Sequence, residues 1–163
     1  MSRSTLHLFT AFAFAILSCL LLLQPAHVLA GQGIDGDWEL NLTKSKYDPG
    51  PPAKSASRSY RTDGDMQTVT IKIVTADGET ISDQVSYRLD GKDYPVKGST
   101  EVDAVAWTMV DDRTARGVTK RDGKIVTQLQ REVSADGKTL TLTTKGKTRD
   151  GRPMSNVLVF DRK

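Results

Sequence analysis

Two charged residues interrupt otherwise apolar faces of predicted strands. Asp83 alternates in step with Val85 and Tyr87, and Arg131 alternates in step with Leu129. Successive side chains of a strand point to opposite faces, so both charges are expected to face the interior. An unpaired buried charge costs several kcal/mol. Each charge must therefore lie at a rim of the fold, pair with the other, or be available to a ligand.

The last of these possibilities gives a binding hypothesis. Arg131, with Tyr87 and Trp107 nearby on the same wall, would hold the head group of an amphipathic anion while aliphatic residues hold its tail. Asp83 completes this set of candidate ligand-binding residues. The chemistry is that of a guanidinium, which donates paired hydrogen bonds to a carboxylate or phosphate.

The groups used in common catalytic and metal sites are missing from most of the chain. Cys19, His7 and His27 are its only cysteine and histidines, and all lie within the first thirty residues. The remainder therefore has no Ser-His-Asp or Cys-His nucleophile, no Cys/His zinc site and no disulfide. Aspartate pairs such as 111–112 lack the ligand spacing of a calcium loop. We expect no enzymatic activity, no metal and no cofactor.

The first thirty residues are typical of a secretory signal peptide. A basic start at Arg3 precedes an apolar run from Leu6 to Leu23 and a small-residue cleavage site that ends at Ala30. We expect a secreted or periplasmic protein, with one domain over 31–163 and no stable membrane insertion after cleavage. Two alternatives stay open: the apolar run is near the length that spans a bilayer and could be kept as an anchor, and Cys19 could be lipidated.

The charge of the remaining chain is balanced. Without Arg3 there are 22 basic and 20 acidic residues, and they are spread evenly. No basic patch with interleaved aromatic residues occurs, which argues against nucleic-acid binding. No change in composition marks a second domain.

Regular alternation and repeated turn signals predict an all-β fold. Asp-Gly, which favours two-residue type I′ hairpin turns, recurs at 63–64, 77–78, 90–91, 122–123, 136–137 and 150–151. Strands are predicted at about 36–43, 55–62, 66–75, 79–89, 92–96, 101–110, 113–121, 124–134, 138–147 and 152–161. Sequential hairpins without a helical period favour an antiparallel up-and-down β-barrel of about eight to ten strands.

Strand parity also predicts the interior. The expected inward residues are Trp38, Leu40, Leu42, Val69, Ile71, Ile73, Ile81, Val85, Tyr87, Leu89, Val105, Trp107, Met109, Ile125, Leu129, Val133, Leu140 and Leu142. The run 157–160 is apolar on both faces, so its parity is undecided. The proline-rich segment 43–52 is the best candidate for a lid over one end of the barrel.

The Gly36-x-Trp38 motif resembles the first strand of lipocalins and fatty-acid-binding proteins, where the tryptophan packs at the closed end of the barrel. A longer resemblance, over 36–51, 90–98 and 156–161, is to small secreted bacterial lipocalin-like proteins of unknown function. It implies a barrel that binds small hydrophobic molecules, with structural roles for Gly36 and Trp38. The chain departs from fatty-acid-binding proteins by having the proline-rich segment 43–52 where they have a helical lid. Asp161-Arg162-Lys163 also does not match their Arg-x-Tyr carboxylate clamp.

These patterns favour a non-enzymatic barrel that binds a small amphipathic or hydrophobic molecule. The alternative is an envelope-associated interaction or structural module whose core is filled by its own side chains. The two differ in whether the interior is hollow.

Overall fold

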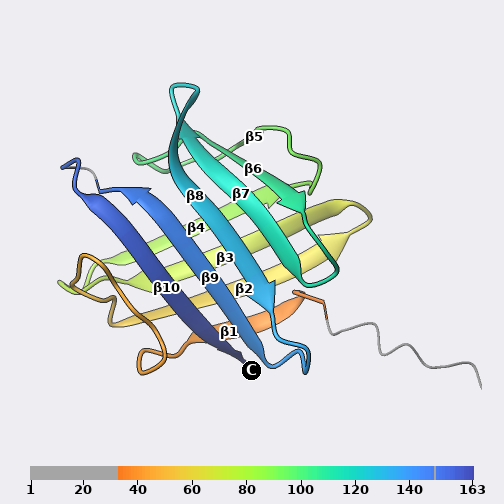
Figure 1. Ribbon diagram of the computed structural model, residues 1–163, viewed down its shortest axis with the longest axis horizontal. Coiled ribbons are helices and arrows are strands. Elements are labelled where there is room, and N and C mark those ends of the chain that lie inside the picture. Colours follow the sequence, from red (N-terminus) through yellow and green to blue (C-terminus); the bar gives the residue numbers. More distant parts are fainter. Residues whose placement is uncertain (1–32, 149) are drawn as a thin grey trace, which may run out of the picture.

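In the computed structural model, residues 33–148 and 150–163 are described, and they form one sheet of ten antiparallel strands. The strands are β1 (Gly36–Leu40), β2 (Ser55–Asp63), β3 (Met66–Val74), β4 (Thr80–Tyr87), β5 (Tyr94–Pro95), β6 (Ala104–Met109), β7 (Thr114–Arg121), β8 (Lys124–Val133), β9 (Thr139–Lys147) and β10 (Pro153–Arg162). Their order is β4-β3-β2-β1-β10-β9-β8-β7-β6-β5 (Figure 1). The predicted up-and-down β-barrel is confirmed. The predicted signal peptide, 1–30, lies outside the described residues.

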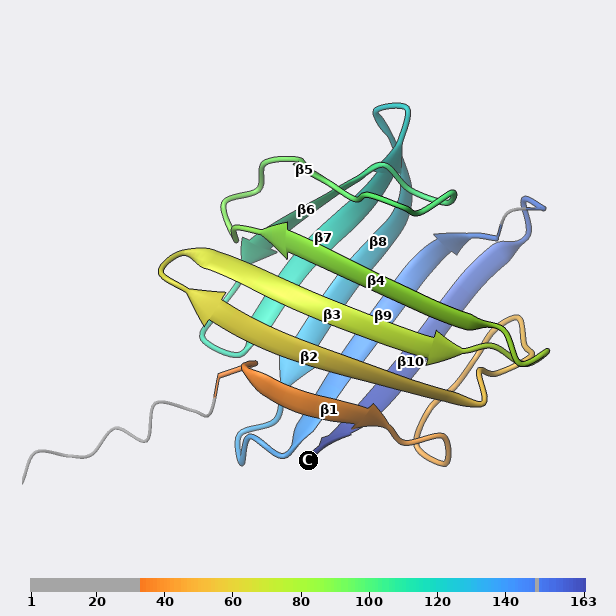
Figure 2. The same cartoon turned by 180° about the vertical axis from the view of Figure 1, so that it is seen from behind.

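The sheet curls until its two edge strands, β4 and β5, come together (Figure 2). No ladder joins these strands. The segment that follows β4 pairs with β6 instead. A single bridge joins Asp90 to Thr108, and the Gly91 N–H donates to the Trp107 carbonyl oxygen at 2.8 Å. The barrel is therefore nearly closed, and the short β5 with its Pro95 lies at the edge, where a missing N–H donor is tolerated.

On the other side of the barrel, the first strand closes onto the last. Trp38 of β1 lies opposite Arg162 of β10. Trp38 is fully buried, its Nε1 donates to the Ile34 carbonyl oxygen at 2.8 Å, and the Arg162 guanidinium lies 4.1 Å from the centre of its ring. Gly36 has a φ of +132°, and a Cβ there would overlap Arg162 Nη1. Trp38 therefore belongs to the core beside the β1–β10 pair. A larger residue at position 36 would collide with Arg162.

The Asp-Gly pairs form turns, but mostly not of the predicted type. Five of the six connect hairpins, whereas Asp90-Gly91 links the two edge strands. Among the described residues only Asp122-Gly123 has both φ angles positive, 51° and 71°, as a type I′ turn requires. At Gly137 the N–H donates to the Ser134 carbonyl oxygen at 2.9 Å. The Ser134 N–H also donates to the Thr139 carbonyl oxygen at 2.8 Å, so this hairpin has a four-residue loop, 135–138, in which Gly137 alone has a positive φ.

The proline-rich segment is tied to the barrel wall. The Lys46 N–H donates to the Val157 carbonyl oxygen at 2.7 Å, and the Val157 N–H donates back at 2.9 Å. The Ser155 N–H donates to the Asp48 carbonyl oxygen at 2.6 Å. The segment predicted as a lid therefore runs along β10 and extends the wall beyond β1.

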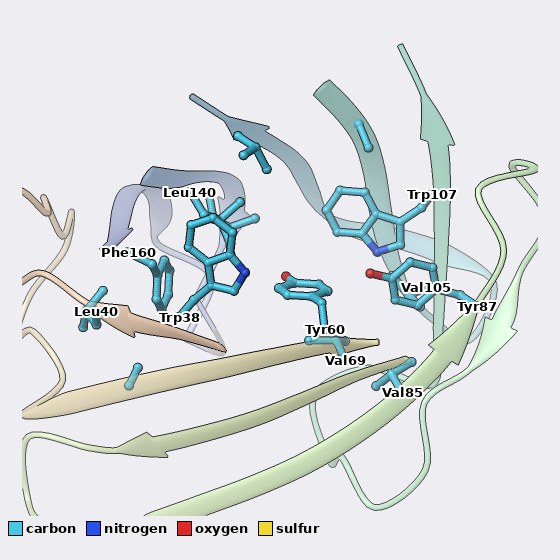
Figure 3. Close-up of a cluster of buried hydrophobic side chains, with 14 residues drawn as sticks. Trp38, Leu40, Tyr60, Val69, Val85, Tyr87, Val105, Trp107, Leu140 and Phe160 are labelled. Atoms are coloured by element: carbon cyan, nitrogen blue, oxygen red, sulfur yellow. The ribbon is translucent and has the colours of Figure 1, made fainter. Parts of the chain in front are cut away.

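Alternation predicted most of the core but not its limits. Leu42, Ile81, Met109 and Ile125 were expected inside but are 43%, 38%, 47% and 59% exposed. All four lie within two residues of a strand end. The parity of β10 is decided by its pairing with β9, which turns Phe160 inward opposite Leu140 (Figure 3).

Turn aspartates make stability sensitive to acid. The pKa of Asp136 is lowered because its carboxylate accepts hydrogen bonds from the Ser134 hydroxyl and the Lys138 N–H, and the pKa of Asp77 is lowered chiefly by the Thr75 hydroxyl. A lowered folded-state pKa adds stability above the unfolded pKa, about 3.9 for Asp, which is lost as the pH falls. With no histidine beyond Ala30, the free energy of unfolding should be flat between about pH 6 and 8 and fall below about pH 4.

Urea unfolding across this pH range measures the effect. The double variant Asp77→Asn/Asp136→Asn keeps a side-chain oxygen at each turn but removes the titrating group, so its loss of stability in acid should be smaller. A stability change centred near pH 6.5 would contradict the assignment, because histidine is the side chain that normally titrates there.

Candidate functional site

The barrel interior is divided into a filled half and a hollow half. Trp38, Leu40, Leu140 and Phe160 fill the space beside β1 and β10, while Trp107, Tyr87 and Val105 lie apart from them, with Tyr60 between the two groups (Figure 3). A pocket of about 190 Å³ lies in the second half, between β2–β4 and β6–β9. Its lining is Arg58, Tyr60, Val69, Ile71, Asp83, Val85, Tyr87, Val96, Ser99, Val102, Val105, Trp107, Thr119, Leu129, Leu142 and Thr144.

Aromatic rings form the most buried part of this pocket. Tyr87 and Trp107 are stacked, with ring centres 6.0 Å apart and an interplanar angle of 24°. The Trp107 ring lies against Gly117 of β7, where a Cβ would approach Trp107 Cδ2 to 2.7 Å and the Ala106 carbonyl oxygen to 2.6 Å. A glycine in mid-strand is unfavourable without such a close approach. Gly117 therefore allows the Trp107 ring to lie flat against β7.

Behind these rings lies Arg131, a buried guanidinium. It is 3% exposed, and its Cζ is 4.8 Å from the centre of the Trp107 ring, 5.4 Å from that of Tyr60 and 5.8 Å from that of Tyr87. Within the described part of the chain it has no carboxylate partner in an ion pair. Three ring faces therefore take the place of a counter-ion, because the face of an aromatic ring carries partial negative charge.

A hydrogen-bonded chain fixes this cluster. Arg131 Nη1 donates to Tyr87 Oη at 2.7 Å, Tyr87 Oη donates to Gln67 Oε1 at 3.2 Å, and Gln67 Nε2 donates to Thr62 Oγ1 at 3.3 Å. Burial raises the pKa of Tyr87 well above its ordinary value, while the nearby Arg131 charge acts in the opposite direction. The hydroxyl therefore stays protonated at neutral pH and can donate to Gln67.

Three of the four candidate binding residues, Tyr87, Trp107 and Asp83, line the same pocket. Tyr87 and Trp107 line the pocket and contact Arg131, and Asp83 lines the same pocket farther along β4. Arg131 itself is not among the lining residues. Arg131 instead lines a separate hollow of about 420 Å³ at the end of the barrel where β1 begins, while its guanidinium lies among the three rings. Arg131 is buried, and within the described residues it forms no ion pair with Asp83.

Three polar side chains complete the pocket wall. Arg58 of β2 and Asp83 of β4 stand in one cross-strand row, each opposite Ile71 of β3. Both are half-buried, and neither forms an ion pair with a residue that the structure describes. Thr119 Oγ1 is a buried side-chain oxygen without a hydrogen-bond partner in the described chain. It lies at the β-bulge where the register of β7 and β8 shifts.

Sequence reasoning missed several of these residues. Arg58 and Tyr60 share the inward parity of β2, but this strand is so polar that it shows no apolar stripe. The alternation of Ala56, Arg58 and Tyr60 was the available signal. Thr119 had none, because its position depends on a bulge that only the pairing of β7 with β8 reveals.

Other surface features are poorer candidates. A hollow of about 700 Å³ lies between the β7–β8 and β9–β10 hairpins, but none of its lining residues is buried. No group of three or more potential metal ligands occurs among the described residues. No helix able to cross a bilayer occurs within 33–148 and 150–163.

Comparison with known proteins gives distant structural likenesses alone. No family description and no curated protein matches the sequence. The chain is similar to a redesigned β-barrel, mFAP1, bound to DFHBI, with a TM-score of 0.48 and 15% identity over 82% of this chain and 98% of that one. It is similar to zebrafish ileal bile acid-binding protein complexed with cholic acid, with a TM-score of 0.48 and 16% identity over 79% and 98%. The siderocalin Ex-FABP gives a TM-score of 0.38 and 11% identity over 79% and 73%.

The Tyr87 hydroxyl is expected to contribute strongly to stability. In Tyr87→Phe, Arg131 Nη1 and Gln67 Oε1 both lose their partner inside the barrel, which should lower the free energy of unfolding by about 2 kcal/mol. Tyr94→Phe is the matched control, because the Tyr94 hydroxyl bonds to Asp90 at the surface and its loss should cost less than about 0.5 kcal/mol. Urea unfolding of both variants measures the difference. Equal losses of unfolding free energy in the two variants would show that the buried hydrogen bonds of Tyr87 add no stability.

Proposed function

We propose that this chain is a secreted or periplasmic, non-enzymatic binding protein that holds one small amphipathic or hydrophobic molecule inside its barrel. The pocket of about 190 Å³ carries the proposal, because its wall combines buried apolar residues with unpaired polar groups. Protein interiors are otherwise close-packed and leave few voids larger than a water molecule. The proposed location rests on the signal-peptide pattern of residues 1–30.

The dimensions and chemistry of the wall define the ligand. Pockets for drug-sized ligands usually occupy about 300–1,000 Å³, so a pocket of about 190 Å³ suits a smaller molecule. Stacked Tyr87 and Trp107 offer a surface for a flat or branched apolar body. Arg131 acts from behind these rings, and its contribution to binding is to hold them in place. The pocket that this arrangement maintains is shaped before a ligand arrives.

The composition of the pocket wall supports a binding role more than a catalytic one. Residues 31–163 contain neither cysteine nor histidine, and the pocket holds a single carboxyl group, that of Asp83. Acid–base hydrolysis of the glycosidase type requires a pair of carboxyl groups. These residues support a binding role.

Native mass spectrometry of the protein purified from its own host tests the proposal. We expect a bound small molecule that accompanies the wild-type protein and is lost from Val85→Phe, which places a larger side chain on the pocket wall. Ser86→Phe is the matched control, because Ser86 is the next residue along β4 and faces outward, so this variant should keep the ligand. Circular dichroism and thermal melting establish that both variants fold.

Two results would overturn the proposal. The first is wild-type protein without any bound molecule in repeated preparations. The second is retention of the same mass by folded Val85→Phe. Either would favour the alternative of an envelope-associated interaction or structural module with a self-filled core, which the packing of Trp38, Leu40, Leu140 and Phe160 already provides in half of the barrel.

A further inference from the structure

Asp83 and Arg58 place opposite charges on the wall of one pocket without neutralising each other. They stand in the same cross-strand row, on either side of Ile71. Neighbouring strands are about 4.8 Å apart, so the two Cα atoms are separated by roughly 10 Å. No ion pair joins them, and each lacks any other charged partner among the described residues. The Arg58 guanidinium instead lies 5.6 Å from the centre of the Phe160 ring.

A ligand that enters this pocket must displace water from both charges. A neutral ligand leaves both charges poorly solvated, and a ligand with one charge leaves the other unpaired. Burying a charge without a partner is costly. A ligand that carries both an ammonium and a carboxylate can pair with Asp83 and Arg58 at once, so it avoids both penalties.

Two further features complete the complement to such a ligand. Thr119 Oγ1 is a buried hydroxyl without a partner in the described chain, and it can accept from an ammonium or donate to a carboxylate. Tyr87 and Trp107, stacked at 6.0 Å, provide an apolar surface for the rest of the molecule. The polar groups and the rings line the same pocket.

From this arrangement we propose that the ligand is a small zwitterion with an apolar body, of the amino-acid class. Its ammonium pairs with Asp83, its carboxylate pairs with Arg58, and its side chain packs against Tyr87 and Trp107. This inference rests on the proposed binding function and assigns the charge of the ligand that the pocket accepts. It gives Arg58 and Asp83, in place of Arg131, the role of selecting the ligand.

Four compounds that share a phenyl group and a short chain separate the contributions. They are phenylalanine, which is zwitterionic, 2-phenylethylamine, which is cationic, 3-phenylpropanoate, which is anionic, and 2-phenylethanol, which is neutral. Isothermal titration calorimetry at pH 7 measures each affinity. We expect the affinity for phenylalanine to be at least about tenfold higher than that for 2-phenylethanol, because phenylalanine makes two charge-assisted contacts that the alcohol lacks.

Charge variants assign each contact. Asp83→Asn should weaken the binding of phenylalanine and 2-phenylethylamine but not that of 3-phenylpropanoate. Arg58→Gln should weaken the binding of phenylalanine and 3-phenylpropanoate but not that of 2-phenylethylamine. Arg61→Gln and Asp65→Asn are matched controls, because both charges are paired at the exposed surface, with Asp37 and Arg88 respectively. The controls should leave all four affinities unchanged.

The outcomes separate this inference from the binding function itself. If 2-phenylethanol binds as tightly as phenylalanine, or if the two pocket variants change nothing, the zwitterion inference is overturned while binding inside the barrel stands. If none of the four compounds binds, the inference is also overturned. The mass of the molecule purified with the native protein then shows whether the binding function fails with it.

Discussion

The enclosure of the Arg131 guanidinium by three aromatic rings is the interaction on which the shape of the pocket depends. A buried cation is stable only if partial negative charge surrounds it or a counter-ion pairs with it. Here Tyr60, Tyr87 and Trp107 come from β2, β4 and β6 to supply that charge, and Arg131 is contributed by β8. The cluster therefore ties opposite walls of the barrel together, and it holds the rings in place as one side of the pocket.

The two seams of the barrel are closed by different means, and this difference explains where the interior is hollow. At the β1–β10 seam, paired strands bring Trp38, Leu40 and Phe160 into close contact, and Arg162 lies over the Trp38 ring. At the other seam, β4 and β5 share no ladder, and the segment after β4 is joined to β6 by the Asp90–Thr108 bridge and by the bond from the Gly91 N–H to the Trp107 carbonyl oxygen. Large side chains fill the first side. The pocket lies toward the second, where Val96, Ser99 and Val102 from the segment between β5 and β6 complete its wall.

The charged and polar groups inside the barrel form two layers, here meaning two groups: Arg131, which the protein itself surrounds, and the groups that line the pocket. Arg131 is enclosed by rings and bonded to the Tyr87 hydroxyl, so its charge is satisfied by the protein itself. Arg58 and Asp83 line the pocket without an ion-pair partner among the described residues, and the Thr119 hydroxyl beside the bulge is likewise unbonded there. The first layer stabilises the structure, and the second is open to a ligand. The hypothesis that Arg131 holds a ligand head group stays a prediction; parity placed this side chain inside the barrel but gave no sign of the three rings around it.

The sequence by itself determined the ten strands, their antiparallel meander and the inward direction of Trp38, Tyr87, Trp107 and Arg131, because alternation and Asp-Gly turns are local signals. The ends of the wall, which expose Leu42 and Ile125, depend on which strands continue opposite each other. The contribution of the polar strand β2, the enclosure of Arg131 and the unbonded Thr119 also required the tertiary structure. These features arise between residues distant in sequence, such as Tyr60 and Arg131. Only the closure of the barrel brings such residues together, since a strand's own pattern fixes the face of a side chain but not its neighbours.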